Sequence, residues 1–133
     1  MNIKEYIKEQ RLITDGAMGT YYEEKYSEDT VIAEKENLKN PEQIKEIHLE
    51  YLRAGARLIR TNTFAANTMF LADMQEVKET VRAGYEIAKE AVTAFQAENG
   101  KEIPVFIGAD LGPIYDLDHQ DYDNVLQEYK EIC

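Results

Sequence analysis

Residues 40–64, NPEQIKEIHLEYLRAGARLIRTNTF, decide the fold of this chain. Their first half repeats at the spacing of one buried stripe on an amphipathic helix. The stripe consists of Ile44, Ile47, His48, Tyr51 and Leu52. Asn40 predicts the N-cap, and Gln43, three residues later, predicts a capping box with it. Gly55 predicts a left-handed end of this helix, and the apolar run at residues 58–59 predicts a strand directly after it.

The same alternation of helix and strand extends on both sides of this unit. Apolar runs at residues 12–13 and 105–107 predict two more strands. Acidic, helix-forming residues precede the first strand, so we expect a short helix there. Strands that alternate with helices indicate parallel strands joined by right-handed crossovers, and hence an α/β fold.

Two further helices are predicted from their apolar stripes. The stripe of the longer helix consists of Val77, Val81, Tyr85, Ala88, Val92 and Phe95. Asn99 and Gly100 predict its C-terminal end, and Gly84 inside it predicts a close approach by a neighbouring element. The last helix carries its stripe from Tyr122 to Ile132, with Asp121 as its expected N-cap.

Two architectures fit this order, an open doubly wound sheet and a (β/α)8 barrel. A barrel needs about 250 residues, whereas this chain has 133. The last helix reaches the end of the chain without a C-cap, as expected at an internal boundary. We therefore predict a partial (β/α)8 TIM barrel made of the first three strands and their helices. Residues 1–133 would be the N-terminal portion of one barrel domain.

Charge and composition exclude several classes of partner. The chain has 15 Lys and Arg against 26 Asp and Glu, a formal net charge of −11. Nucleic acids and anionic membranes bind basic surfaces, so we expect neither as a partner. The sequence shows no bilayer-length apolar run and no apolar signal core, which predicts a cytoplasmic protein. The single cysteine, Cys133, agrees with a reducing compartment and rules out an internal disulfide.

Each predicted strand runs into a polar cluster: TDGAMGT at residues 14–20, TNTF at 61–64 and GADLGP at 108–113. The C-terminal ends of parallel strands meet at one edge of the sheet, where ligands bind in α/β folds. We therefore expect the three clusters to form one polar pocket. The candidate ligand-contacting residues are Asp15, Gly16, Ala17, Thr61, Asn62, Thr63 and Asp110.

The first cluster indicates the class of ligand. Gly16 permits close approach of the backbone, and successive free N–H groups in such a turn suit a carboxylate or phosphate. Asp15 either fixes the turn or faces a ligand ammonium group. The cluster matches neither G-x-G-x-x-G nor the P-loop pattern, so an amino acid fits better than a nucleotide.

A purely structural interpretation stays open for each cluster, as an ordinary turn or as a strand end that satisfies its own backbone groups. His48 is interpreted as a packing residue. His119, in an acidic loop, is interpreted as solvent-facing.

Three separated motifs, LITDGAMGTYY, EKENLKNPEQIKEIHLEYLRAGARLIRTNTFAAN and IGADLGP, together resemble the N-terminal half of the homocysteine S-methyltransferase family. That family includes cobalamin-dependent methionine synthase modules, betaine and S-methylmethionine enzymes, and a bacterial form fused to methylenetetrahydrofolate reductase. The DGAMGT motif at residues 15–20 is most similar to the folate-dependent and reductase-fused branches. The resemblance implies a (β/α)8 barrel, and a pocket in which Asp15 and Gly16 hold the amino-acid end of homocysteine. Thr61, Asn62, Thr63 and Asp110 would line the same pocket.

The resemblance also implies chemistry that this chain does not carry by itself. Family members use zinc, bound by three cysteines from the second half of the barrel, to present homocysteine as a thiolate to a methyl donor such as a folate or cobalamin. Cys133 matches no such motif, and the family's later carboxylate for the homocysteine amine is missing.

Three hypotheses follow from these observations. In the first, the chain is the N-terminal part of a zinc-dependent enzyme that makes methionine, and the chain alone is inactive. Alternatively, it is a small amino-acid-binding module without catalysis. As a third possibility, it is a partial barrel that self-associates through exposed strand edges.

Overall fold

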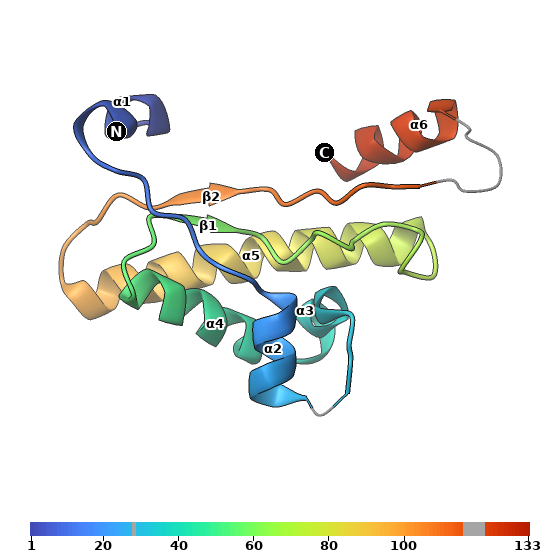
Figure 1. Ribbon diagram of the computed structural model, residues 1–133, viewed down its shortest axis with the longest axis horizontal. Coiled ribbons are helices and arrows are strands. Elements are labelled where there is room, and N and C mark those ends of the chain that lie inside the picture. Colours follow the sequence, from blue (N-terminus) through green and yellow to red (C-terminus); the bar gives the residue numbers. More distant parts are fainter. Residues whose placement is uncertain (28, 116–121) are drawn as a thin grey trace.

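The computed structural model describes residues 1–27, 29–115 and 122–133 (Figure 1). The chain folds as a mostly helical α/β structure with a small sheet. Its elements are α1 (Ile3–Glu9), α2 (Gly19–Tyr26), the 3-10 helix η1 (Ala33–Lys35), α3 (Glu36–Lys39), α4 (Pro41–Arg53), β1 (Leu58–Arg60), α5 (Met74–Asn99), β2 (Phe106–Gly108) and α6 (Tyr122–Ile132). The expected positions of His119 and Asp121 lie outside the described residues.

The sheet consists of β1 and β2, which pair in parallel with Leu58 opposite Phe106 and Arg60 opposite Gly108. The prediction of parallel strands is confirmed, although β2 begins one residue later than expected. The predicted strand at residues 12–13 is wrong as a strand. This segment runs beside β1 and forms a single parallel bridge, between Thr14 and Leu58. Pairing ends after the Asp15 N–H donates to the Leu58 carbonyl at 2.9 Å, because the chain then turns away into the glycine-containing segment.

Helix α4 begins and ends close to its predicted limits, but its N-terminus is not capped as expected. Asn40 occupies the N-cap position without a capping hydrogen bond. Its side-chain amide donates to Glu36, and Gln43 accepts from the Tyr22 hydroxyl instead of completing a capping box. The capping-box prediction is therefore wrong, because both side chains are used in contacts with neighbouring helices. After the helix, Gly55 has the expected positive φ, 112°.

The packing interpretation of His48 is confirmed. His48 lies on the buried side of α4, and its exposed fraction is 0%. Neither ring nitrogen has a hydrogen-bond partner among the described residues. Burial lowers the pKa of His48 to about 4, and the nearby charge of Asp15 opposes this shift. The ring is therefore neutral at neutral pH.

Helix α5 is longer than its apolar stripe. It begins after Asp73, whose carboxylate accepts from the Glu76 N–H at 2.9 Å, and it ends at Gly100, which has φ 62° as predicted. Tyr85 departs from the predicted stripe because its side chain is 48% exposed. Gly84 is a site of close approach, as expected: a Cβ there would lie 2.8 Å from the Thr63 methyl group and 2.9 Å from the Asn37 amide nitrogen.

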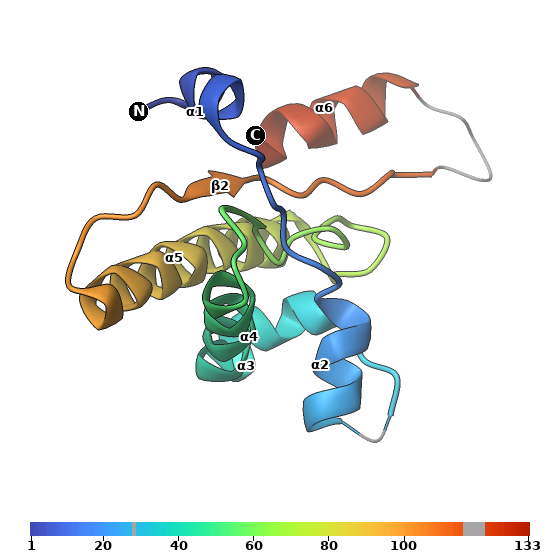
Figure 2. The ribbon, with the colours of Figure 1, turned by 60° about the vertical axis from the view of Figure 1, so that its left-hand side comes forward.

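Helices α4 and α5 cover one face of the sheet, while α1 and α6 lie on its other side (Figures 1 and 2). The largest core cluster joins α4, β1 and α5; its buried members are Leu49, Leu52, Ala56, Ile59, Ala88, Ala91 and Phe95. A second cluster joins α2, η1, α4 and α5; its buried members are Tyr22, Ala33, Ile44, Ile47 and Ile87. The strand ends are thereby fixed on a rigid support. Within residues 1–27, 29–115 and 122–133, no helix is both long and apolar enough to cross a membrane.

Candidate functional site

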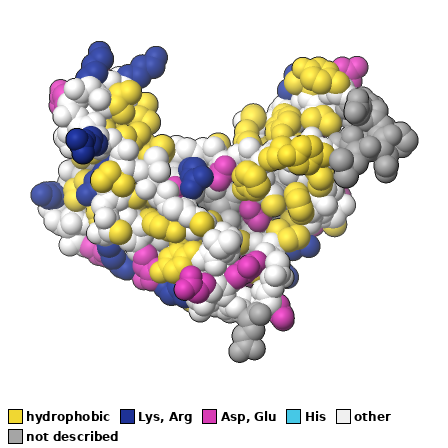
Figure 3. All heavy atoms as spheres, in the orientation of Figure 1, with side chains coloured by type: hydrophobic (Ala, Val, Ile, Leu, Met, Phe, Trp, Pro, Cys, Tyr) yellow, Lys and Arg dark blue, Asp and Glu magenta, His cyan; other side chains and the backbone are white. Residues whose placement is uncertain are grey.

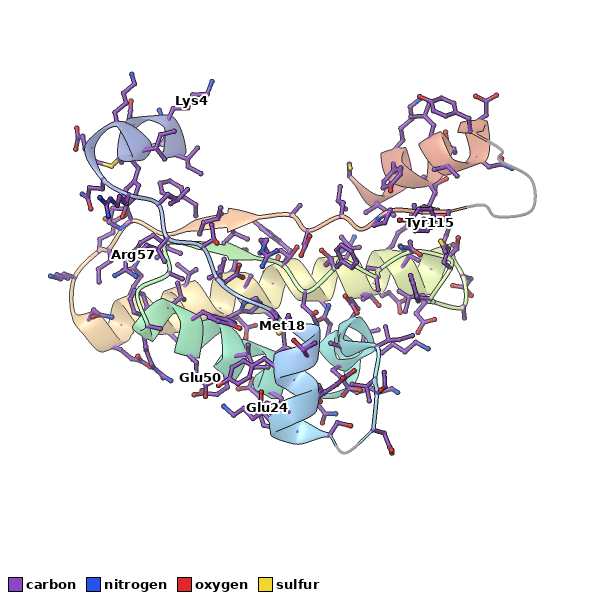
Figure 4. All side chains as sticks on the ribbon, in the orientation of Figure 1. Lys4, Met18, Glu24, Glu50, Arg57 and Tyr115 are labelled. Carbon is purple, nitrogen blue, oxygen red and sulfur yellow. The ribbon has the colours of Figure 1, made fainter. Side chains whose placement is uncertain are left out.

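A cavity of about 250 Å³ lies where the three predicted clusters meet. All seven candidate residues named from the sequence line it: Asp15, Gly16, Ala17, Thr61, Asn62, Thr63 and Asp110. Met18, Gly19, Glu34, Arg60 and Phe64 complete the lining. Met18 lies at the start of α2 (Figure 4). In the space-filling view, basic and acidic side chains lie close together near the middle of the face (Figure 3). The convergence of the clusters is thus observed, whereas contact with a ligand stays a prediction.

Asp15 is held by the end of β1. Its carboxylate accepts from the Arg60 backbone N–H at 2.8 Å and from Arg60 Nε at 2.9 Å. Arg60 Nη2 also donates to the Gly16 carbonyl at 3.0 Å. The Asp15 side chain is only 4% exposed, so its charge is compensated inside the fold by one guanidinium group. These contacts assign Asp15 to fixing the turn.

The turn after Asp15 is also fixed from the side of α4. The Tyr51 hydroxyl donates to the Ala17 carbonyl at 2.7 Å. A Cβ on Gly16 would lie 2.8 Å from the same hydroxyl oxygen. A side chain at this position would push the Tyr51 ring away from the turn, which gives Gly16 a steric role in addition to lining the cavity.

Several backbone N–H groups along this turn have no hydrogen-bond acceptor among the described residues. Within the part of the chain that the structure describes, the N–H groups of Gly16, Ala17, Met18 and Gly19 donate to no protein acceptor. Gly19 is also the first residue of α2, and Met18 provides no side-chain cap. Free N–H groups at a helix N-terminus carry partial positive charge and suit a carboxylate or phosphate.

The two threonines of the second cluster tie it to the third. Thr63 donates its hydroxyl hydrogen to the Asp110 carbonyl at 2.7 Å, and the Asp110 N–H donates to Thr61 Oγ1 at 3.2 Å. The two hydroxyl oxygens lie 2.7 Å apart. Because Thr63 has already used its hydrogen, Thr61 is the donor in that pair. Both hydroxyl hydrogens are therefore used within the protein, which favours a structural role for these side chains.

Asn62 faces away from the sheet into a buried amide network. Its side-chain nitrogen donates to the Ala33 carbonyl and to Asn37 Oδ1, both at 2.8 Å. Asn37 in turn donates to the carbonyls of Asn62 and Thr80. This network joins η1, α3 and α5 to the end of β1, so Asn62 positions the cavity wall.

Charges around the cavity are balanced unevenly. The hydrogen bond to Asp15 raises the pKa of the Arg60 guanidinium. Burial raises the pKa of the Asp110 carboxyl, and Arg60, whose Nη1 lies 3.8 Å from Asp110 Oδ2, opposes that rise. Glu34 is buried and accepts from the Ala65 N–H at 3.0 Å. The cavity thus combines one cation with three carboxyl groups.

Sequence reasoning missed Arg60 and Glu34. A signal for Arg60 was present, because it stands directly before the TNTF cluster at the end of the predicted strand. Glu34 lies in the charged run AEKEN and is distant along the chain from the strand ends, so local sequence gave no comparable signal.

The described residues do not form a metal site. No group of three or more His, Cys, Asp or Glu side chains among them is arranged to hold a metal ion. Cys133 is exposed and lies at the end of α6. The residues present therefore do not fit the zinc site that the sequence resemblance implies for the family.

Comparison with known proteins identifies the family. A family model described as homocysteine S-methyltransferase matches residues 12–132. The chain belongs to this family. It is 32% identical over 112 residues to the homocysteine S-methyltransferase of Escherichia coli strain K12, an alignment that covers 80% of this chain and 36% of that protein. It is also 26% identical over 144 aligned positions to the methionine synthase of Mycobacterium leprae strain TN, covering 98% of this chain and 12% of that protein.

Solved structures of the homocysteine S-methyltransferase family agree with the fold. The oxidized form of the homocysteine methyltransferase MmuM from Escherichia coli superposes with a TM-score of 0.73 at 28% identity, covering 94% of this chain and 42% of that chain. The metallated form of MmuM gives a TM-score of 0.69 at 28% identity, over 92% of this chain and 42% of that one. The chain thus spans 42% of these MmuM chains, 36% of the Escherichia coli homocysteine S-methyltransferase and 12% of the methionine synthase.

Proposed function

We propose that this chain is the N-terminal part of the homocysteine-binding barrel of a homocysteine S-methyltransferase, and that it binds the amino-acid end of homocysteine. In this proposal the segment at Thr14, β1 and β2 are the first three strand positions of a (β/α)8 barrel. The order Thr14, β1, β2 across the sheet supports it, as does the superposition on MmuM over 94% of the chain.

One observation carries the binding proposal: the four consecutive residues from Gly16 to Gly19 line the cavity at the start of α2, and their N–H groups have no acceptor among the described residues. A carboxylate placed there accepts several hydrogen bonds and lies at the positive end of the helix dipole. Met18 and Phe64 add apolar surface for the methylene chain of the ligand. We assign the carboxylate of homocysteine to this turn.

We propose further that methionine is made by the longer protein, by transfer of a methyl group to the homocysteine sulfur. In this proposal the zinc ligands lie outside the described residues, which form no group that could hold a metal ion. A folate or cobalamin methyl donor and a fused methylenetetrahydrofolate reductase remain predictions of the sequence resemblance alone. Localisation in the cytoplasm is likewise a prediction from composition.

Calorimetric titration of the 133-residue chain tests the binding proposal. We expect heat with homocysteine and methionine at millimolar concentration, and none with 3-aminopropane-1-thiol, which is homocysteine without its carboxylate. Absence of heat with both amino acids would contradict the proposal. Equal binding of the amine without a carboxylate would contradict the assignment to the 16–19 turn.

A second measurement tests whether the chain is inactive by itself. Alone, the chain is expected to form no methionine from homocysteine with any methyl donor and to bind no zinc tightly in equilibrium dialysis. Methionine formation by these 133 residues would show that they hold the complete machinery.

We retain self-association as a third proposal, because β2 pairs with β1 on one side only within the described residues. An unpaired strand edge invites pairing with another copy. A monodisperse monomer in light scattering would contradict it.

A further inference from the structure

Arg60, at the end of β1, makes hydrogen bonds to Asp15 and Gly16 in addition to the pairing of its strand. Its backbone N–H, its Nε and its Nη2 all donate to the neighbouring turn, at 2.8, 2.9 and 3.0 Å. The first two engage different oxygens of Asp15, and the third engages the Gly16 carbonyl. Arg60, at the end of β1, thus holds Asp15 and Gly16, the two residues at which the cavity turn begins.

These contacts leave Asp15 in a defined state. An aspartate this deeply buried is costly unless it is paired and hydrogen-bonded. Arg60 donates one hydrogen bond to each carboxylate oxygen of Asp15, and the Asp15 side chain is 4% exposed. The carboxylate is therefore directed at the guanidinium group and is a poor partner for the ammonium group of a ligand.

The Gly16 carbonyl is the second point of the clamp. Peptide groups are planar, so fixing the Gly16 C=O fixes the following N–H of Ala17 as well. Tyr51 holds the Ala17 carbonyl in the same way, at 2.7 Å, and so fixes the N–H of Met18. The orientation of the Ala17 and Met18 N–H groups therefore depends on Arg60 and Tyr51 together.

We propose that Arg60 is a positioning residue for recognition of the ligand carboxylate: by binding Asp15 and the Gly16 carbonyl, it fixes the start of the 16–19 turn and the orientation of the Ala17 N–H. This inference rests on the proposed binding of homocysteine for its functional consequence, but not for the clamp itself. It predicts that Arg60 and Asp15 act as one unit on the carboxylate end of the ligand and not on its amine.

Arginine is required for this geometry, and lysine does not replace it. A guanidinium group presents Nε and Nη2 in a fixed plane, which lets it engage Asp15 and Gly16 at once, whereas an ammonium group is a point charge on a flexible chain. Arg60 Nη1 also lies 3.8 Å from Asp110 Oδ2, which extends the clamp toward the third strand end.

The clamp is tested without ligand by NMR of the labelled chain. We expect a slowly exchanging Nε–H signal from Arg60 that disappears in Asp15→Asn, and shifted amide signals for residues 16–19 in Arg60→Gln and Arg60→Lys. Arg53→Gln is the matched control, because Arg53 also pairs with carboxylates but on the exposed surface between α4 and α5. If the 16–19 amides respond no more to Arg60→Gln than to Arg53→Gln, the clamp is overturned.

Calorimetry then tests the function of the clamp with homocysteine and with 4-sulfanylbutanoate, which keeps the carboxylate and lacks the amine. Losing charge-assisted hydrogen bonds predicts roughly 10–100-fold weaker binding of both ligands to Arg60→Gln. Asp15→Asn should weaken both similarly, and the double variant should be no weaker than either single one. Arg60→Lys should fall between Arg60→Gln and the unchanged chain.

The outcomes of the two tests are separable. If Arg60→Gln weakens homocysteine but not 4-sulfanylbutanoate, the pair serves the amine and the proposal is wrong. Additive losses in the double variant would equally overturn the idea of one unit. If the unchanged chain binds neither ligand, the proposed homocysteine site fails and the carboxylate role fails with it, whereas the NMR experiment still decides the clamp.

Discussion

Helices α4 and α6 share an amphipathic sequence pattern but have different surroundings. Both are short amphipathic helices with apolar residues along one stripe. In α4, the stripe is buried; its buried members are Ile44, Ile47, His48, Leu49 and Leu52. In α6, no residue is buried, and Tyr122 is 74% exposed.

The difference lies in the neighbours of each helix. Helix α4 packs between α5, β1 and the α2–α3 region, whereas α6 contacts α5 with its C-terminal end, where Ile132 meets the cluster around Val77. Hydrophobic side chains gather on the surface near α6 (Figure 3), and Tyr115 lies on the segment below it (Figure 4). An apolar stripe thus predicts a helix, and burial depends on the elements that surround it.

The largest expected effect compares one leucine on each helix. Leu52 on α4 is 1% exposed, and Leu126 on α6 is 36% exposed. We expect Leu52→Ala to lower the free energy of unfolding by about 2–5 kcal/mol, because it removes buried methyl groups and leaves a cavity. Leu126→Ala, the same chemical change, should lower it by less than about 1 kcal/mol. Urea unfolding followed by circular dichroism measures both.

Equal losses for the two leucine variants would contradict the comparison, since they would mean that α6 is as well packed in solution as α4. Such a result would also support self-association, provided that the loss at Leu126 increased with protein concentration.

The same contrast explains which parts of the fold were predictable. Helix limits followed from period and from glycine, as at Gly55 and Gly100, because these are local properties of the backbone. The capping box at Asn40 was wrong because Glu36 and Tyr22 compete for the same side chains. Tyr85 was placed in a buried stripe, since the sequence cannot tell which faces of α5 have neighbours.

The site was predictable in outline and not in its internal bonding. That three strand ends converge follows from parallel topology, and the cavity lining agrees with it. The roles within the lining depend on hydrogen bonds between segments far apart in sequence. The pairing of Arg60 with Asp15 spans 45 residues, and the Thr63–Asp110 bond spans 47. No local pattern encodes such pairs.

His48 provides the next test, because it is the polar residue in the otherwise apolar stripe of α4. Its pKa falls from 6.5 to about 4 on burial, so the unfolded chain binds a proton more readily than the folded chain between these values. Stability contributed by the neutral ring is therefore complete above pH 6.5 and is lost as the pH falls toward 4. The shift corresponds to roughly 3 kcal/mol across that window.

Replacing His48 by leucine should remove this pH dependence. We expect His48→Leu to be at least as stable as the unchanged chain at neutral pH, because two unpartnered ring nitrogens are replaced by apolar atoms of similar volume. From pH 6.5 to pH 4, the variant should lose about 3 kcal/mol less of its free energy of unfolding. Parallel pH profiles for the two proteins would show that His48 is hydrated or paired in solution.

The smallest expected effect compares two glycines, Gly84 on α5 and Gly19 on α2. A Cβ on Gly84 would lie under 3.0 Å from both Thr63 and Asn37, whereas a Cβ on Gly19 would meet no atom within 4 Å. Alanine favours a helix over glycine by about 1 kcal/mol, so propensity alone predicts that both substitutions stabilise the chain. At Gly84 the overlap should dominate, and we expect Gly84→Ala to lower the free energy of unfolding by about 1–3 kcal/mol.

Gly19→Ala should instead raise the free energy of unfolding, by less than about 1 kcal/mol. Thermal unfolding followed by circular dichroism measures both variants, and a rise in the free energy of unfolding for Gly84→Ala as well would show that α5 has room to move away from the strand end. Since the Thr63 methyl group is what Gly84 accommodates, its displacement should also disturb the hydroxyl bond to Asp110. Gly84→Ala would then also weaken homocysteine binding. The close packing of α5 would thereby be linked to the geometry of the cavity.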